Sequence, residues 1–142
     1  MNTRRVVLDT DVASLSIKHA LPAWLLAELL GAQTAITFVT LGELTRWATL
    51  RSWGTTRRAE LATWLASRPT LPYSEQVAVR WGEISAHAVR RGRPRPQNDT
   101  WIAACSLTFD LPLATLNLKD FRDFAEHEGL QLIRPPDHDE PA

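Results

Sequence analysis

Acidic and amide side chains stand at four places in this chain where a strand is expected to end or a helix to begin. They are Asp9 with Asp11, Glu43, Asp99, and Asn117 with Asp120. Hard divalent cations take oxygen ligands, and Mg²⁺ is usually held by one or two carboxylates together with waters and substrate phosphates. If folding brings these residues together, the pattern predicts a site for Mg²⁺ or Mn²⁺.

A cation at such a site would serve phosphodiester chemistry. Three or four carboxylates in one pocket repel one another, so without a cation some of them must take up protons. A bound ion removes this repulsion, lowers the pKa of a water and stabilises the charge that develops on a phosphate. Hydrolysis of a phosphodiester without a protein nucleophile requires the lowered water pKa and the stabilised phosphate charge.

Each acid also has a purely structural explanation. Asp9 or Asp11 can cap a helix that follows the first strand. The stretch 40–43 fits a capping box, in which Glu43 reaches back to a backbone N–H. Asp99 in a first helical turn is favourable for the helix dipole, and the amide and acid of the last cluster can shape a turn. The metal hypothesis therefore rests on the shared position of the clusters.

Strands and helices alternate along the chain, and this order positions the four clusters. Runs rich in β-forming residues predict strands at 5–8, 35–39, 113–116 and 130–133. Apolar residues at helical spacing predict helices from about 12, at 21–30, after 40, at 57–68, from 75 to about 88, from a cap at Asn98 through 107, and around 121–127. Such alternation implies an α/β fold with a mainly parallel sheet covered on both faces. Ligands of these sheets bind beyond the carboxyl ends of the strands.

Size and composition indicate one domain. The chain has 142 residues, of which 44% are hydrophobic, and can form a core without disulfides. We expect a domain over 1–136 and an acidic, disordered tail over 137–142. The apolar stretch 21–39 contains too many polar residues to span a membrane, and the N-terminus lacks the apolar region of a secretory signal. We therefore expect a cytoplasmic protein, with the single Cys105 buried.

A basic segment precedes Asp99. It contains Arg90, Arg91, Arg93 and Arg95, with two prolines and a glycine that prevent regular structure. Positive charge beside a proposed metal ligand suits binding of an RNA backbone. The alternative is a solvated Arg/Pro loop in a chain where Arg outnumbers Lys 14 to 2. The balance of 16 basic and 16 acidic residues also argues against a strongly basic surface.

Four stretches of the chain resemble, in order and spacing, the motifs of PIN-domain ribonucleases, and in particular those of VapC-type toxins. They are VLDTDV at 7–12, TLGEL at 40–44, NDTWIAA at 98–104 and ATLNLKDF at 114–121. The resemblance covers about residues 5–134. It implies a three-layer α/β/α sandwich and an endoribonuclease that depends on Mg²⁺ or Mn²⁺ and acts as the toxin of a toxin–antitoxin pair. It also implies an RNA substrate (tRNA, rRNA or mRNA), a homodimer, and a cognate antitoxin that inserts into the active-site groove.

The resemblance also assigns roles to residues. Carried over by position, Asp9, Glu43 and Asp99 would bind the metal. The family has Asp or Asn where Asn117 stands, and Asp120 lies three residues further on. Either of these two would complete the catalytic site through a bound water.

Two other functions remain open from sequence. The stretch 9–12 also fits the opening motif of haloacid-dehalogenase-like phosphatases, in which the first Asp becomes an aspartyl phosphate and the second is the acid/base. That mechanism makes Asp11 indispensable, whereas PIN-domain ribonucleases more often have Asn there. The chain is short for such a phosphatase and lacks its later lysine motif. The other alternative is a PIN-like module that binds RNA or a partner without cutting.

Overall fold

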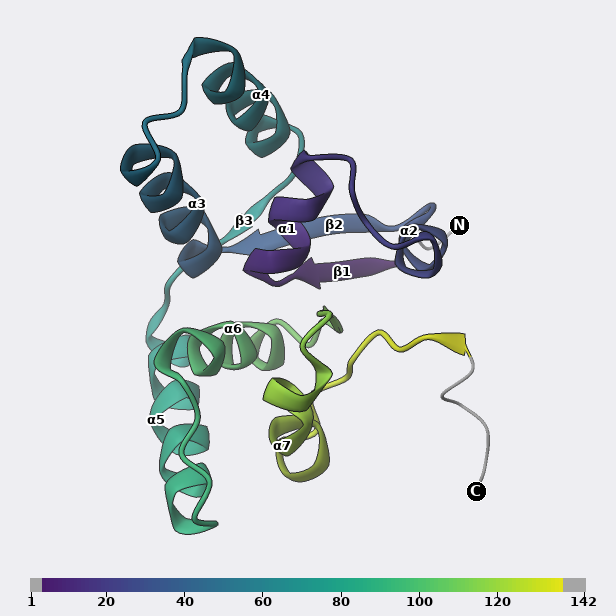
Figure 1. Cartoon of the computed structure of the whole chain (residues 1–142). Coiled ribbons are helices and arrows are strands. Elements are labelled where there is room, and N and C mark those ends of the chain that lie inside the picture. The colour runs from purple at the N-terminus through teal and green to yellow at the C-terminus, as the bar shows by residue number, and fades with distance from the viewer. Residues whose placement is uncertain (1–3, 137–142) are drawn as a thin grey trace.

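The computed structural model describes residues 4–136 and shows a parallel sheet enclosed by helices (Figure 1). The sheet has four strands in the order β3-β2-β1-β4, all paired in parallel. The strands are β1 (Arg5–Leu8), β2 (Gln33–Thr37), β3 (Thr70–Leu71) and β4 (Leu113–Ala114). The helices are α1 (Thr10–Ile17), α2 (Ala23–Leu29), α3 (Phe38–Leu50), α4 (Thr55–Ala66), α5 (Glu75–Arg90), α6 (Gln97–Thr108) and α7 (Leu118–Glu128).

The sheet has a hydrophobic core on each face, because neighbouring residues of a strand point to opposite sides. Val7 of β1 packs with residues of α5, α6 and α7. Val6 and Leu8 of the same strand pack with residues of α1, α2, α3 and α4. Figure 1 shows these two groups of helices on opposite sides of the sheet. The predicted three-layer α/β/α sandwich is confirmed.

The carboxyl ends of the parallel strands meet at one edge of the sheet. Asp9 directly follows β1, Asn117 lies between β4 and α7, and α3 begins immediately after β2. Helix α6 belongs to the other helical layer, and it contacts α3. Both helical layers therefore deliver residues to this edge, as the strand–helix order predicts.

Strand β2 gives way to α3 two residues earlier than the sequence suggested. The strand covers Gln33–Thr37 rather than 35–39. Thr37 is the N-cap of α3, and its hydroxyl accepts a hydrogen bond from the Thr40 N–H at 3.3 Å. The predicted cap at Thr40 is wrong because Thr40 already lies inside the helix.

Three further elements differ from the sequence expectations. Helix α6 begins directly after Pro96, so Asn98 lies in its first turn and does not cap it. The strand expected at 130–133 is reduced to a bridge between Leu113 and Leu132, because β4 has only two residues with which it could pair. Strand β3 was not predicted, since two residues are too few to show an alternating pattern.

The remaining expectations concern positions away from this edge. Cys105 is buried in α6, and burial raises the pKa of its thiol to about 12. Within residues 4–136, no helix is long and apolar enough to cross a membrane. The acidic tail expected at 137–142 lies outside the residues that the structure describes.

Candidate functional site

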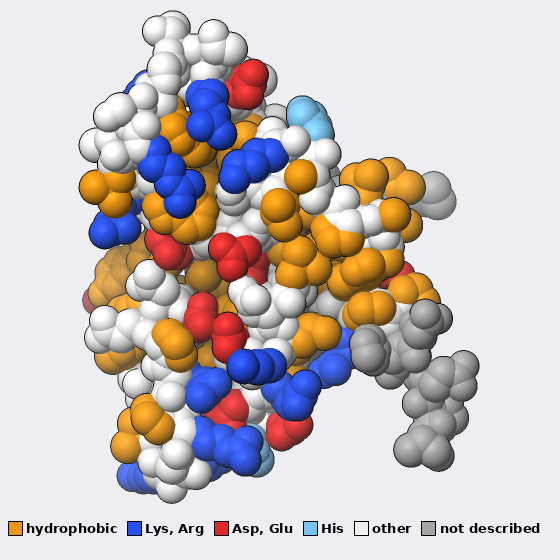
Figure 2. Space-filling view, viewed as in Figure 1, with side chains coloured by type: hydrophobic (Ala, Val, Ile, Leu, Met, Phe, Trp, Pro, Cys, Tyr) orange, Lys and Arg blue, Asp and Glu red, His pale blue; other side chains and the backbone are white. Residues whose placement is uncertain are grey.

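A small polar cavity of about 80 Å³ lies at the carboxyl edge of the sheet. We refer to it as the acidic pocket. It is lined by Asp9, Thr10, Asp11, Glu43, Trp47, Asp99, Ile102 and Asn117. In Figure 2, acidic side chains gather in the middle of one face of the molecule, with Lys and Arg side chains above and below them. A larger cavity of about 780 Å³ between α1 and α4 has only Glu60 as a carboxylate in its lining. The acids therefore meet in the smaller cavity.

Asp9 is a helix cap and a pocket residue at once. Its Oδ1 atom accepts a hydrogen bond of 2.8 Å from the Val12 N–H at the start of α1. The backbone N–H of Asp9 donates to the Ala114 carbonyl of β4, which fixes the end of β1 beside that strand. Only 4% of Asp9 is exposed. Asp9 therefore caps α1 and also lines the acidic pocket.

Glu43 is held by residues of two other helices. Its Oε1 accepts from the Thr10 hydroxyl at 2.7 Å, and its Oε2 accepts from the Asn98 side-chain amide at 3.1 Å. A hydroxyl has a single hydrogen, so Thr40, 2.9 Å from Thr10, then donates to Thr10. Glu43 lies in the second turn of α3 and makes no capping box. The structural explanation for this acid is wrong, and its carboxylate links α1, α3 and α6.

Asn117 bridges to Asp11 instead of capping α7. It stands at the N-cap position without a side-chain capping bond, and its Nδ2 donates to Asp11 Oδ2 at 2.9 Å. Asp99 lies in the first turn of α6 and is half-buried in the pocket wall. Asp120, in the first turn of α7, is not among the lining residues. Of the two residues considered for completing the site, Asn117 is the one in the pocket wall.

The acids act on one another electrostatically. The pKa of Asp9 is raised to about 6, mainly by burial and in smaller part by the charges of Asp11 and Asp99, while hydrogen bonding to Thr115 and Val12 opposes the rise. The pKa of Asp99 is also raised to about 6, first by burial and then by neighbouring acids that include Asp120 and Glu43. Two carboxyl groups with raised pKa values indicate a cluster whose negative charge is only partly compensated.

The donor set fits a hard divalent cation. The carboxylate, hydroxyl and side-chain amide groups that line the acidic pocket can supply oxygen ligands, and a cation would relieve the repulsion between the buried acids. Within residues 4–136, no three carboxylate, imidazole or thiol groups are already arranged to hold one ion directly. Mg²⁺ needs only one or two protein carboxylates, because waters and substrate phosphates complete its octahedron.

Comparisons with known proteins agree with this geometry. The chain is 36% identical over 112 residues to Ribonuclease VapC5 of Mycobacterium tuberculosis, a match that covers 75% of this chain and 79% of the relative. The chain belongs to the VapC family of PIN-domain ribonucleases. The resemblance carried by the four sequence stretches is therefore confirmed. A scan against protein-family models finds no match.

Solved VapBC structures share the fold of this VapC-family chain. The toxin–antitoxin complex VapBC-5 of M. tuberculosis matches with a TM-score of 0.68 and 31% identity, over 92% of this chain and 98% of that chain. VapBC2 of Rickettsia felis, bound to a DNA fragment from its promoter, matches with a TM-score of 0.77 and 22% identity, over 91% and 97% of the two chains. The second likeness shows the fold alone.

Three pocket residues escaped the sequence reasoning. Thr10 adjoins Asp9 and orients Glu43. Trp47 follows Glu43 by four residues, and Ile102 follows the acid of α6 by three. These spacings place side chains on the same face of a helix. The helical period could therefore have predicted that Trp47 and Ile102 share the pocket with Glu43 and Asp99. Trp47 and Ile102 form the apolar part of the pocket wall.

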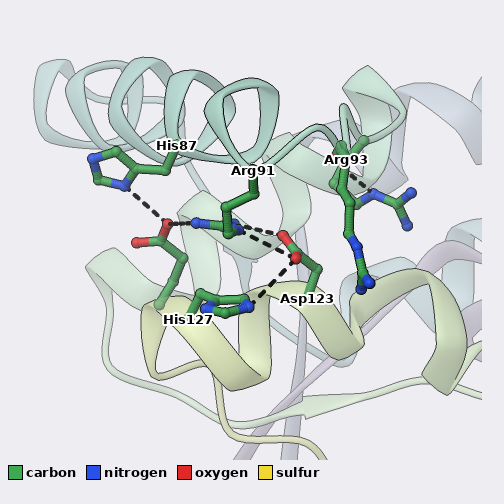
Figure 3. Close-up of polar contacts among 7 residues, drawn as sticks. His87, Arg91, Arg93, Asp123 and His127 are labelled. Carbon is green, nitrogen blue, oxygen red and sulfur yellow. Dashed lines mark hydrogen bonds and ion pairs between the residues drawn. The ribbon is translucent and has the colours of Figure 1, made fainter.

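The basic segment of this VapC-family chain lies beside the pocket, but its arginines differ in environment. Arg90 and Arg93 are exposed, and Arg95 is half-buried. The charge of Arg95 counteracts the raised pKa of Asp99, so the two groups are electrostatically coupled. Arg91 instead forms ion pairs with acids of α7 (Figure 3). The sequence alone predicts four equivalent RNA contacts, whereas the structure gives Arg91 carboxylate partners that set it apart from Arg90, Arg93 and Arg95.

Proposed function

We propose that this VapC-family chain is a cytoplasmic endoribonuclease that depends on Mg²⁺ or Mn²⁺ and is the toxin of a type II toxin–antitoxin pair. The acidic pocket is the observation that carries the proposal, because carboxylates from the end of β1 and from α1, α3 and α6 line one cavity. The relative named a ribonuclease and the VapBC complexes of the same fold support the reaction class. The substrate class is RNA.

The residues of the pocket divide the work of this reaction. Asp9, Glu43 and Asp99 would hold the ion, and Asn117 or Asp120 would complete the site through a water. When bound, the ion would lower the pKa of a water and stabilise negative charge on the phosphate. The hydrogen bonds from other helices keep the Glu43 carboxylate in one orientation. The apolar wall limits the number of competing waters.

Sequencing of RNA 5′ ends after brief induction tests the proposal and finds the target at once. New 5′ ends should accumulate at a small set of sites in cells that express the wild-type protein. They should be missing from cells that express Asp99→Asn to the same level. Growth arrest without new ends would favour the module that binds without cutting. Identical new ends in both strains would overturn the proposal.

Asp11→Asn should retain RNA cleavage, within about threefold of the wild-type rate. The asparagine keeps an oxygen that can accept from Asn117, and it removes a charge that raises the pKa values of Asp9 and Asp99. Initial rates with Mn²⁺ and a fluorogenic RNA measure the effect. In the alternative phosphatase mechanism Asp11 is the acid/base. If the wild-type protein hydrolyses a phosphomonoester and Asp11→Asn does not, the phosphatase assignment replaces the nuclease.

The VapBC neighbours support a cognate antitoxin as the protein partner. An Arg or Lys of that partner, placed in the acidic pocket, would replace the charge of the cation and block the site through charge-assisted hydrogen bonds. We also propose a homodimer. Light scattering would reject the dimer if it detected only the monomer mass of 16.0 kDa.

A further inference from the structure

One arginine of the basic segment is turned into the protein. We define the basic loop as residues 91–96, which connect α5 to α6. Arg91 Nη2 and Nε donate to the two carboxylate oxygens of Asp123, at 2.5 and 3.3 Å, and its Nη1 donates to Glu128 at 3.4 Å. The Arg91 side chain is 22% exposed and that of Asp123 only 4%. This is a two-pronged ion pair that is largely withdrawn from solvent.

The acids that hold Arg91 both belong to α7, and two histidines extend the contact. His87 of α5 lies 2.9 Å from Glu128, and His127 of α7 lies 3.8 Å from Asp123 (Figure 3). The Arg91 guanidinium holds the pKa of Asp123 below its ordinary value, so the pair is ionised at neutral pH. Together these contacts fasten the start of the basic loop to α7.

The rest of the basic loop has few other restraints. Its backbone N–H groups up to Arg93 bond back to α5, and its last residue, Pro96, accepts from Thr100 in α6. Between these ends, Arg95 Nε donates to the Arg93 carbonyl at 3.3 Å. Arg95 is coupled electrostatically both to Asp99 at the pocket and to Asp123 at the ion pair.

We propose that Arg91 is a positioning residue that ties the basic loop to α7 and so directs Arg93 and Arg95 at an RNA backbone beside the acidic pocket. The inference rests on the proposed function and divides the arginines by role. Arg91 acts through its neighbours without touching RNA. A guanidinium suits this task because its planar fork matches a carboxylate with two parallel hydrogen bonds, which an ammonium cannot do.

The substitution Asp123→Asn separates this proposal from a direct RNA contact by the sign of its effect. If Arg91 anchors the loop, loss of its partner should weaken RNA binding about fivefold or more. If Arg91 itself contacts RNA and Asp123 merely competes, the substitution frees the guanidinium, removes a negative charge and should strengthen binding. Glu126→Gln, an exposed acid on the same helix, is the matched control and should not weaken binding.

The measurement is fluorescence anisotropy with a short fluorescein-labelled single-stranded RNA of mixed sequence. EDTA is present so that metal-dependent cleavage does not compete, and two salt concentrations report the number of phosphate contacts. Thermal unfolding of each variant checks the fold. If Asp123→Asn does not fold, Arg91→Lys decides, because it keeps the charge without the fork. Weak binding by folded Arg91→Lys supports the anchor, and wild-type binding overturns it.

A double-mutant cycle between Arg91→Ala and Arg95→Ala gives a second readout. An anchor that acts through Arg93 and Arg95 predicts non-additive effects, so Arg91→Ala should weaken RNA binding less in the Arg95→Ala background than in the wild-type protein. Additive effects would overturn the proposal.

Failure of the proposed nuclease function can be distinguished from failure of the anchor. Wild-type protein that binds RNA but cuts none with Mn²⁺ rejects the nuclease and leaves the anchor standing, whereas wild-type protein that binds no RNA overturns the anchor.

Discussion

Replacement of Asp99 by asparagine should lower metal-dependent RNA cleavage by at least about a hundredfold, because it removes a charged oxygen ligand from the acidic pocket. Asparagine has the same shape, and Asp99 lies half-buried in the first turn of α6, where an amide is tolerated. The fold should therefore survive. Asp9→Asn should lower activity to a similar extent, because it also removes a carboxylate from the pocket. Its fold should survive, since the amide oxygen can still cap α1.

The experiment compares kcat/KM for a fluorogenic RNA with Mn²⁺. Asp110→Asn is the matched control, because it removes an exposed acid just beyond the opposite end of α6. Asp110 has a φ of 55°, a conformation that asparagine also adopts readily. We expect wild-type kcat/KM for this control. Similar rates for wild type and Asp99→Asn would show that the pocket does not perform the chemistry.

The metal-free protein should lose stability as pH rises from 5 to 7. Asp9 and Asp99 have folded pKa values of about 6, above the ordinary value of 3.8. The folded state therefore binds protons more tightly, and the resulting stabilisation is complete below pH 3.8 and is lost as pH rises through about 6. For the buried Asp9 a shift of this size corresponds to at most about 3 kcal/mol, and the half-exposed Asp99 contributes less because solvent screens it.

Divalent metal should reverse this loss. At pH 7, Mn²⁺ should raise the thermal midpoint of the wild-type protein by several degrees, because the ion binds only the folded state. Asp99→Asn should be more stable than wild type in EDTA at pH 7 and should respond little to Mn²⁺. Thermal unfolding followed by circular dichroism measures both effects. A wild-type midpoint that changes neither with pH nor with Mn²⁺ would contradict the assignment of a metal site.

The four clusters could be placed at one edge from sequence because parallel strands end on the same side of a sheet. This rule needs only the order of strands and helices, which the short β-branched runs and helical spacings reveal. It locates Asp9 and Asn117 directly. The bonds that orient Glu43 could not be foreseen, since Thr10 and Asn98 lie 33 and 55 residues away in the chain.

The sequence could not distinguish residues of the same type that lie close together in the chain. Thr37 and Thr40 both have the side chain of a good helix cap, and the length of β2 decided between them. The four arginines before α6 also read alike in sequence. The environment of Arg91 depends on Asp123, 32 residues further on. Pairing across such a separation is a property of the packed helices and cannot be read from neighbouring residues.

Part of the lining of the acidic pocket is synthesised late, in the last third of the chain. Glu43 is anchored by Asn98, and Asp99 and Asn117 belong to the last third of the sequence. A nascent chain that has emerged only as far as α5 lacks Asp99, Asn117 and the bond from Asn98 to Glu43, and so holds only part of the lining of the acidic pocket. The proposed RNA cleavage would therefore require a chain whose translation is complete or nearly so.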